Sequence, residues 1–217
     1  MACVEMRLKN ICLQINQKTI LNNINVSIEQ GKIYLFIGKS GSGKTSLLNI
    51  MNFLYKPTSG EIEYHGEPID NEDENKISDL RNKDIAYFQQ ELSFVEGISI
   101  WENFKIFASI KGVHLDRDKI VSLSKKLGIS SLLNENVSVL SGGERQRAAF
   151  LKLLFLPSNI VLIDEPTNNL DKENIAIILE AIRMLKDEGK TIIIVSHAED
   201  VISIADECFR MEELNEK

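Results

Sequence analysis

The spacing of hydrophobic residues in the first part of the chain predicts β-strands. Ile24, Val26 and Ile28 alternate with polar residues, which is typical of a strand with one exposed face. After Gly31 the pattern changes to the uninterrupted apolar run 33–37, which predicts a strand covered on both faces. The chain therefore begins with a half-exposed β region that leads into a buried strand.

The next segment predicts a helix followed by a hairpin. A helical pattern runs from about residue 44 to about residue 53, and the stretch from Pro57 to Gly60 breaks it. Residues 60–69 then predict two short strands with a turn at His65-Gly66.

Helical spacing dominates from residue 98 to about residue 134. Ser99 and Glu102 form a capping box, in which the serine and a glutamate three residues later satisfy each other's backbone N–H groups at a helix start. A second helix is expected over about 116–127, with Gly128 at its end. The first helix carries three aromatic side chains, Trp101, Phe104 and Phe107. We expect this helical segment to form a small lobe inserted between β-rich parts.

The last third of the chain predicts a strand, a helix and a strand. The apolar runs 160–163 and 191–195 suit a parallel sheet covered on both faces. Between them, Asp171 can cap a helix over 172–188 that Gly189 ends. The apolar face of that helix consists of Ile175, Ile178, Leu179, Ile182 and Leu185. The order of elements predicts an α/β fold, with no room for a regulatory domain after the last strand.

Composition places the chain among globular proteins. Its 217 residues are 43% hydrophobic and 26% charged, and no apolar run approaches the roughly 20 residues that span a bilayer. The N-terminus lacks the apolar core of a signal peptide, so we expect a cytoplasmic protein. Cys3, Cys12 and Cys208 show no C-x-x-C spacing, which argues against a disulfide framework or a zinc site and leaves reduced thiols.

The charge balance argues against a nucleic-acid partner. The net charge is −7 and the pI is about 5.1, so a basic surface for phosphate backbones is not expected. The most acidic segment, 70–74, is interpreted as a solvated loop.

The most informative chemistry is a glycine-rich loop between the strand 33–37 and the following helix. It fits the phosphate-binding pattern G-x-x-x-x-G-K-[ST], in which glycines let backbone N–H groups converge on an anion at a helix start. Lys44 adds charge for the β- and γ-phosphates, and the Thr45 hydroxyl suits Mg²⁺. The expected nucleotide-binding residues are Gly38, Lys39, Ser40, Gly41, Ser42, Gly43, Lys44, Thr45 and Ser46.

Two further segments carry candidate chemistry. Ser141 and Glu144 form a second capping box, and Gly142 and Gly143 leave backbone N–H groups accessible for an anion at that helix start. The alternative is a capping box that binds no ligand.

A carboxylate pair follows the strand 160–163, at the sheet edge where a phosphate loop is expected. There Asp164 can hold the metal and Glu165 can orient or deprotonate the attacking water, whereas the alternative is an acidic strand end in solvent. His197, just after the strand 191–195, either reaches the γ-phosphate or is a structural histidine.

Taken together, these segments resemble the ATP-binding-cassette (ABC) ATPases along nearly the whole chain. Residues 38–45 resemble the Walker A motif, 160–165 the Walker B motif and 140–144 the ABC signature. Gln90 resembles the Q-loop glutamine, 169–171 the D-loop, and His197 the switch histidine.

The resemblance implies a P-loop NTPase fold with a mixed or parallel core sheet, an N-terminal antiparallel β subdomain and an inserted helical subdomain. It implies one ABC ATPase domain over 1–217, with its core in about 1–90 and 141–217 and its helical subdomain in about 91–140.

ATP and Mg²⁺ are the ligands that the resemblance implies, with catalytic roles for Lys44, Gln90, Glu165 and His197 and with Thr45, Gln90 and Asp164 at the metal. It also implies a head-to-tail homodimer or heterodimer, in which Ser141, Gly142, Gly143 and Glu144 of one subunit cover the ATP of the other.

The same resemblance implies a partner permease that holds the chain at the cytoplasmic face of the membrane. Residues 81–87 are most similar to the small ATPases of macrolide export and lipoprotein release. Cell-division-type mechanical signalling, a cytosolic assembly process and a regulatory subunit that only binds nucleotide remain alternatives.

Three features are specific to this chain. Ile15 stands about where many relatives have an aromatic ring that stacks on adenine, so we expect weak discrimination between ATP and GTP. Asn168-Asn169 precedes the D-loop where small residues are commoner. Six aromatic residues lie between 87 and 107; they are interpreted mainly as the core of the helical lobe, with Phe94 and Trp101 as candidate exposed anchors for a permease.

Overall fold

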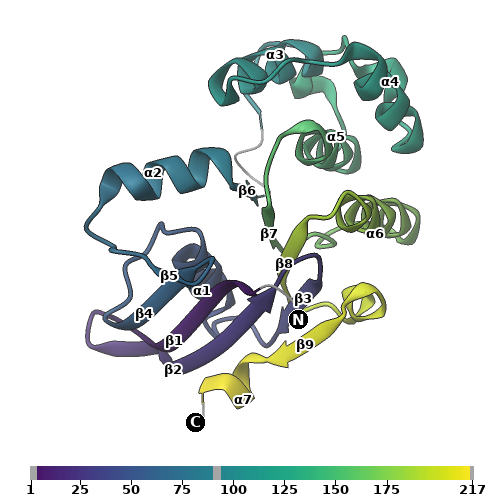
Figure 1. The fold of residues 1–217 in the computed structure, drawn as a ribbon. Coiled ribbons are helices and arrows are strands. Elements are labelled where there is room, and N and C mark those ends of the chain that lie inside the picture. Colours follow the sequence, from purple (N-terminus) through teal and green to yellow (C-terminus); the bar gives the residue numbers. More distant parts are fainter. Residues whose placement is uncertain (1–3, 90–93, 216–217) are drawn as a thin grey trace.

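A computed structural model describes residues 4–89 and 94–215 of the chain. It contains an antiparallel sheet at one end of the molecule and a helical region at the other, with a parallel sheet between them (Figure 1). This arrangement confirms the predicted α/β class.

The antiparallel sheet is built from the N-terminal third of the chain, in the order β2-β1-β4-β5. Its strands are β1 (Val4–Ile15), β2 (Lys18–Glu29), β4 (Ser59–Tyr64) and β5 (Glu67–Pro68). The predicted alternation is present, since Ile24, Val26 and Ile28 are buried while the residues between them are exposed. The predicted turn at His65-Gly66 joins β4 to β5.

The parallel sheet has the order β6-β7-β8-β3-β9. Its strands are β3 (Ile33–Ile37), β6 (Ile85–Phe88), β7 (Ile160–Asp164), β8 (Thr191–Ser196) and β9 (Glu207–Arg210). Ile37 pairs with Ser196 and Asp164 pairs with Val195, so the carboxyl ends of β3, β7 and β8 meet at one edge. Residues that follow these strands are therefore brought together from distant parts of the sequence.

The helices cover both faces of the parallel sheet (Figure 1). They are α1 (Lys44–Met51), α2 (Glu74–Lys83), α3 (Ile100–Lys111), α4 (Arg117–Lys126), α5 (Gly142–Phe155), α6 (Lys172–Asp187) and α7 (Met211–Asn215). The 3-10 segments η1 (Ser130–Leu132) and η2 (Val137–Val139) lie between α4 and α5, and η3 (Glu199–Ile204) lies between β8 and β9. No helix within 4–89 and 94–215 combines the length and the apolar character needed to cross a bilayer.

Two hydrophobic clusters explain why the central strands are continuously apolar. Leu35 and Ile194 belong to the cluster with α3, α4, α5 and α6, whereas Phe36 and Ile193 belong to the cluster with α1 and the antiparallel sheet. Because successive strand residues point to opposite faces, a strand covered on both sides needs an apolar residue at every position. The helical segment thus shares its core with the sheet on which it packs.

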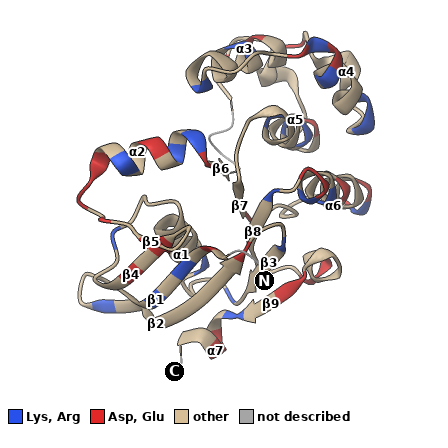
Figure 2. Ribbon diagram, in the orientation of Figure 1, with Lys and Arg blue, Asp and Glu red and all other residues tan. Residues whose placement is uncertain are grey.

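The structure agrees with the interpretation of the acidic segment as a solvated loop for residues 70–73, which lie outside any helix or strand and are exposed except for the half-buried Asn71, and it adds a helix, α2, that the sequence did not predict. Asp73 caps α2, because its side chain accepts a hydrogen bond from the Lys76 N–H at 3.0 Å, and Glu74 is the first residue of that helix. Only Ile77 of α2 is buried, and charged residues alternate with uncharged ones along the helix (Figure 2). A helix with so little apolar surface has no periodic hydrophobic pattern to predict it.

Phe94 and Trp101, the candidate exposed anchors, are less exposed than expected. Both are partly buried against the cluster around α3 and α5. The Phe94 ring lies 6.3 Å from that of Phe107, and the Arg117 guanidinium lies 5.6 Å from the Trp101 ring centre. These rings support the alternative interpretation, in which they form part of the core of the helical lobe.

Candidate functional site

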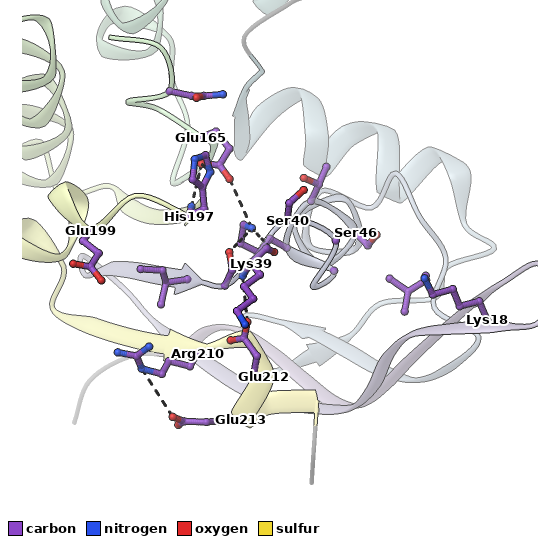
Figure 3. Close-up of a pocket in the computed structure, with 18 residues that line it drawn as sticks. Lys18, Lys39, Ser40, Ser46, Glu165, His197, Glu199, Arg210, Glu212 and Glu213 are labelled. Carbon is purple, nitrogen blue, oxygen red and sulfur yellow. Dashed lines mark hydrogen bonds and ion pairs between the residues drawn. The ribbon is translucent and has the colours of Figure 1, made fainter. Parts of the chain in front are cut away.

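A cavity of about 1120 Å³ opens at the edge where the carboxyl ends of β3, β7 and β8 meet (Figure 3). The glycine-rich loop between β3 and α1 forms one wall. The residues after β7 and β8 form a second wall, and the end of β9 with α7 forms a third. The side chains that converge there come from segments spread over the whole sequence.

The loop conformation requires glycine at the start of α1. Gly43 is the N-terminal flanking residue of the helix and has φ 92°, in the left-handed region. A Cβ at this position would lie 2.9 Å from Leu21 Cδ2 and 3.0 Å from the Ile20 carbonyl oxygen. Gly43 therefore lets the loop turn into the helix while β2 packs closely behind it, and the first N–H groups of α1 are left at the cavity.

Lys44 lies almost fully buried within the loop, with 7% of its surface exposed. Its Nζ donates hydrogen bonds to the carbonyl oxygens of Gly38 at 2.7 Å and Lys39 at 3.1 Å. The same atom is 3.8 Å from Glu165 Oε1. A positive charge is thus held between the loop backbone and a carboxylate, where the phosphate of a nucleotide would compete for it.

Asp164 and Thr45 place two side-chain oxygens next to each other at the cavity. Thr45 Oγ1 donates to Asp164 Oδ2 at 3.1 Å, while the buried Asp164 Oδ1 has no hydrogen-bond partner among the described residues. Burial raises the pKa of Asp164, as expected for a carboxyl that lacks a compensating cation. An unpaired buried carboxylate oxygen beside a hydroxyl fits a hard cation such as Mg²⁺.

Glu165 links the end of β7 to the end of β8. Its Oε2 accepts hydrogen bonds from Ser196 Oγ and from the His197 N–H, both at 3.1 Å. His197 Nδ1 lies 2.9 Å from the same oxygen, so the imidazole and the carboxylate are in direct contact. Oε1 is left facing Lys44. One carboxylate oxygen is therefore fixed by the β8 end, and the other points toward the loop.

The residues predicted in the phosphate loop line the cavity except for Ser42, and among the other predicted site residues in the described part of the chain Glu165 and His197 line it, whereas Ile15, Asp164 and residues 141–144 do not. Ser42 does not line it, because its Oγ is buried without a partner in the described part of the chain. Ile15 is at the end of β1, 41% exposed, and is not a lining residue either. Gln90 lies outside the described residues.

The predicted signature residues stand away from this cavity, at the start of α5. Ser141 Oγ accepts from the Glu144 N–H at 3.4 Å, and Glu144 Oε2 accepts from the Ser141 N–H at 2.8 Å, so the predicted capping box is present. A Cβ on Gly142 would meet open space, whereas one on Gly143 would lie 2.9 Å from Asn174 Oδ1. The backbone at Gly142 is thus open to an approaching group.

Sequence analysis missed several residues of the cavity wall. Glu199, Arg210, Glu212 and Glu213 line it from η3, β9 and α7, and Lys18 and Ile20 line it from β2 (Figure 3). Asn168, noted as a departure before the D-loop, also lines it. Alternation marked β2 as a strand, but no local signal showed that its start, or the chain after β8, would reach the phosphate loop.

Comparison with known proteins gives matches over most of the chain. The family model described as "ABC transporter" covers residues 21–168. The chain is 30% identical over 199 residues to the ABC transporter ATP-binding protein YtrE of Bacillus subtilis, covering 90% of this chain and 86% of YtrE. It is 34% identical over 196 residues to the lipoprotein-releasing system ATP-binding protein LolD of Francisella tularensis, covering 88% of this chain and 85% of LolD.

Other similarities involve a larger protein and solved structures. The chain is 35% identical to the macrolide export ATP-binding/permease protein MacB of Campylobacter jejuni, over 88% of this chain and 30% of MacB. The dimeric structure of MJ0796, a bacterial ABC transporter cassette, matches with a TM-score of 0.82 and 26% identity, over 95% of this chain and 94% of that one. A dimeric post-hydrolysis state of MJ0796 bound to ADP and Pi matches with the same TM-score over 94% and 93% of the two chains.

Proposed function

The chain belongs to the ABC transporter family as an ATP-binding subunit with ATPase activity, and from this premise we propose that it drives a separate membrane permease in export or in lipid or lipoprotein handling. The observation that carries the proposal is the convergence of Lys44, Asp164, Glu165 and His197 on one cavity edge.

The comparisons support a permease on another polypeptide. YtrE and LolD, named as ATP-binding proteins, match this chain over most of their length, whereas MacB, named as an ATP-binding/permease protein, matches over 30%. In this proposal the chain works as one ATPase domain at the cytoplasmic face of the membrane. Its helical subdomain, at about 91–140, lies nearest the permease.

The proposed chemistry assigns a task to each residue of the site. The loop N–H groups and Lys44 bind the β- and γ-phosphates, and the close approach of Lys44 to Glu165 Oε1 places that oxygen beside the γ-phosphate. Glu165 then orients the attacking water and accepts its proton, while His197 holds Oε2 of the same carboxylate. Asp164 and Thr45 would hold Mg²⁺, which neutralises phosphate charge when bound.

A head-to-tail dimer completes the proposed site. Residues 141–144 do not line the cavity of their own chain, and yet the N–H groups at the start of α5 are suited to an anion. A second copy, or a related cassette, would bring this helix start to the γ-phosphate. The dimeric structures of MJ0796 support such a pair.

The Glu165→Gln variant tests both the hydrolysis and the dimer. We expect it to bind ATP and to lose hydrolysis, because the amide cannot accept the proton of water. ATP should then trap a dimer visible by size-exclusion chromatography. Glu180→Gln on α6, which removes an exposed carboxylate paired with Arg183, is the control and should hydrolyse ATP normally. Near wild-type hydrolysis by Glu165→Gln would show that Glu165 is not the catalytic carboxylate.

A further inference from the structure

The phosphate loop is held by a second set of contacts that comes from the C-terminal helix α7. Glu212 Oε1 accepts a hydrogen bond from the Lys39 N–H at 3.2 Å, and both residues are seen in Figure 3. Asn215 Nδ2 donates to the Ser42 carbonyl oxygen at 3.3 Å, while its Oδ1 accepts from the Asn22 N–H of β2 at 3.0 Å. A helix of five residues thus bonds the loop twice and ties it to a strand.

The two bonded residues are the ends of one tight turn. The Ser42 N–H donates to the Lys39 carbonyl oxygen at 3.2 Å, which closes the turn around Ser40 and Gly41. Gly41 has φ 81° and would meet nothing within 4 Å if it carried a Cβ, so packing does not restrain this part of the loop. Hydrogen bonds at Lys39 and Ser42 therefore decide where the turn lies.

Packing on α7 reinforces these bonds. Met211 is fully buried, and a Cβ on Gly38 would lie 3.0 Å from Met211 Cβ. Hydrogen bonds from its own N–H and from the Lys39 N–H lower the pKa of Glu212, so this side chain is a carboxylate at neutral pH. It is consequently a strong acceptor for the loop and also a negative charge at the rim of the cavity.

We propose that Glu212 and Asn215 are positioning residues that hold the phosphate loop in its nucleotide-binding conformation. The proposal rests on the nucleotide binding proposed above. Lys44 Nζ also restrains the loop through the carbonyls of Gly38 and Lys39, but a phosphate competes for that ammonium group. The bonds from α7 are made to the Lys39 N–H and the Ser42 carbonyl and not to the Lys44 ammonium group, so they do not depend on whether that group binds the loop carbonyls or a phosphate.

Binding of MgADP to the full-length chain, measured by calorimetry, tests the proposal without requiring a dimer. Glu212→Ala and Asn215→Ala each remove one bond to the loop, and we expect each to weaken binding about three- to tenfold. Glu212→Gln keeps an acceptor for the Lys39 N–H but removes the charge, so its affinity should equal or exceed that of the wild type. Glu207→Gln, which removes a carboxylate of β9 that pairs with Lys32, should leave affinity unchanged.

Hydrogen exchange at the Lys39 amide provides a second readout. Exchange should be faster in Glu212→Ala than in Glu212→Gln, since only the alanine variant lacks an acceptor. If Glu212→Ala binds MgADP as tightly as the wild type or more tightly, the carboxylate acts only as a repulsive charge and the proposal is overturned. Equal losses in the alanine and glutamine variants would overturn it as well. A wild-type chain that does not bind MgADP would instead contradict the proposed function itself.

Discussion

Glu165 is held in a backbone conformation that few non-glycine residues adopt. Its φ is 47°, in the left-handed region, which costs of the order of 1 kcal/mol for a residue with a Cβ. The Glu165 N–H donates to the Val195 carbonyl at 3.0 Å, and the side chain is bound by Ser196 and His197. The end of β8 thus compensates for the unfavourable turn and fixes the direction of the carboxylate.

The weak discrimination between ATP and GTP that we predict depends on residues at the start of the antiparallel sheet. No aromatic side chain lines the cavity in the described part of the chain, and the nearby β2 residues are Lys18 and Ile20. Without a ring to stack on, a base loses an interaction worth about 1 kcal/mol or more. We expect ATP and GTP to bind with affinities within about fivefold, as measured by competition. A strong preference of the wild type for ATP would contradict this interpretation of Ile15.

At the scale of elements, the chain contains two capping boxes of nearly the same geometry. At the start of α3, Ser99 Oγ donates to Glu102 Oε2 at 2.8 Å, and at the start of α5, Ser141 Oγ donates to Glu144 Oε2 at 2.7 Å. Each box satisfies backbone N–H groups that a helix start leaves free. The two boxes should therefore stabilise their helices to a similar extent. If one of them also has a functional role, that role must come from a group that approaches the start of its helix.

Replacing each serine by alanine separates helix stabilisation from a role in ATP hydrolysis. Ser99→Ala and Ser141→Ala should both lower the free energy of unfolding by about 1 kcal/mol, which thermal denaturation can measure. Only Ser141→Ala should also lower the ATPase rate, by about tenfold or more, because we propose that its hydroxyl reaches the γ-phosphate in the partner subunit. Equal losses of ATPase activity in the two variants would speak against a dimer contact at α5.

At the scale of the whole molecule, a groove lies between the helical region and the parallel sheet. A cavity of about 240 Å³ there is lined by residues of α3, α5 and β6, among them Tyr87, Phe107, Ile110 and Leu153. Ile110 is 64% exposed, more than Phe94 or Trp101, which pack against the lobe core. Under the proposed function, we place Ile110 and this groove in the surface that contacts a permease.

We predict that Ile110→Asp reduces co-purification of an integral-membrane permease by about tenfold or more, because the substitution removes apolar contact area and brings a charge into the interface that must be desolvated. Binding of MgADP should not change. Ile202→Asp on η3, at another exposed isoleucine, is the matched control and should retain the permease. Undiminished co-purification with Ile110→Asp would place the permease contact elsewhere and reopen the cell-division and cytosolic alternatives.

Local features of this protein could be predicted from the sequence because their causes are local. The apolar runs of β3, β7 and β8, the amphipathic α6 and both capping boxes depend on residues a few positions apart. The same holds for the motif of the glycine-rich loop, because the pattern G-x-x-x-x-G-K-[ST] occupies the eight consecutive residues 38–45. The order of these motifs along the chain was also sufficient to predict the family, which the comparisons confirm.

Contacts between segments that are far apart in the sequence could be found only in the tertiary structure. Glu212 and Asn215 bond to Lys39 and Ser42 across 173 residues in each case, and nothing in the pattern of α7 indicates that contact. The exposed, highly charged α2 and the distance of Ser141 from the cavity likewise depend on which surfaces the packed elements leave open. Hydrophobic spacing records which side of an element is buried, but not which element buries it.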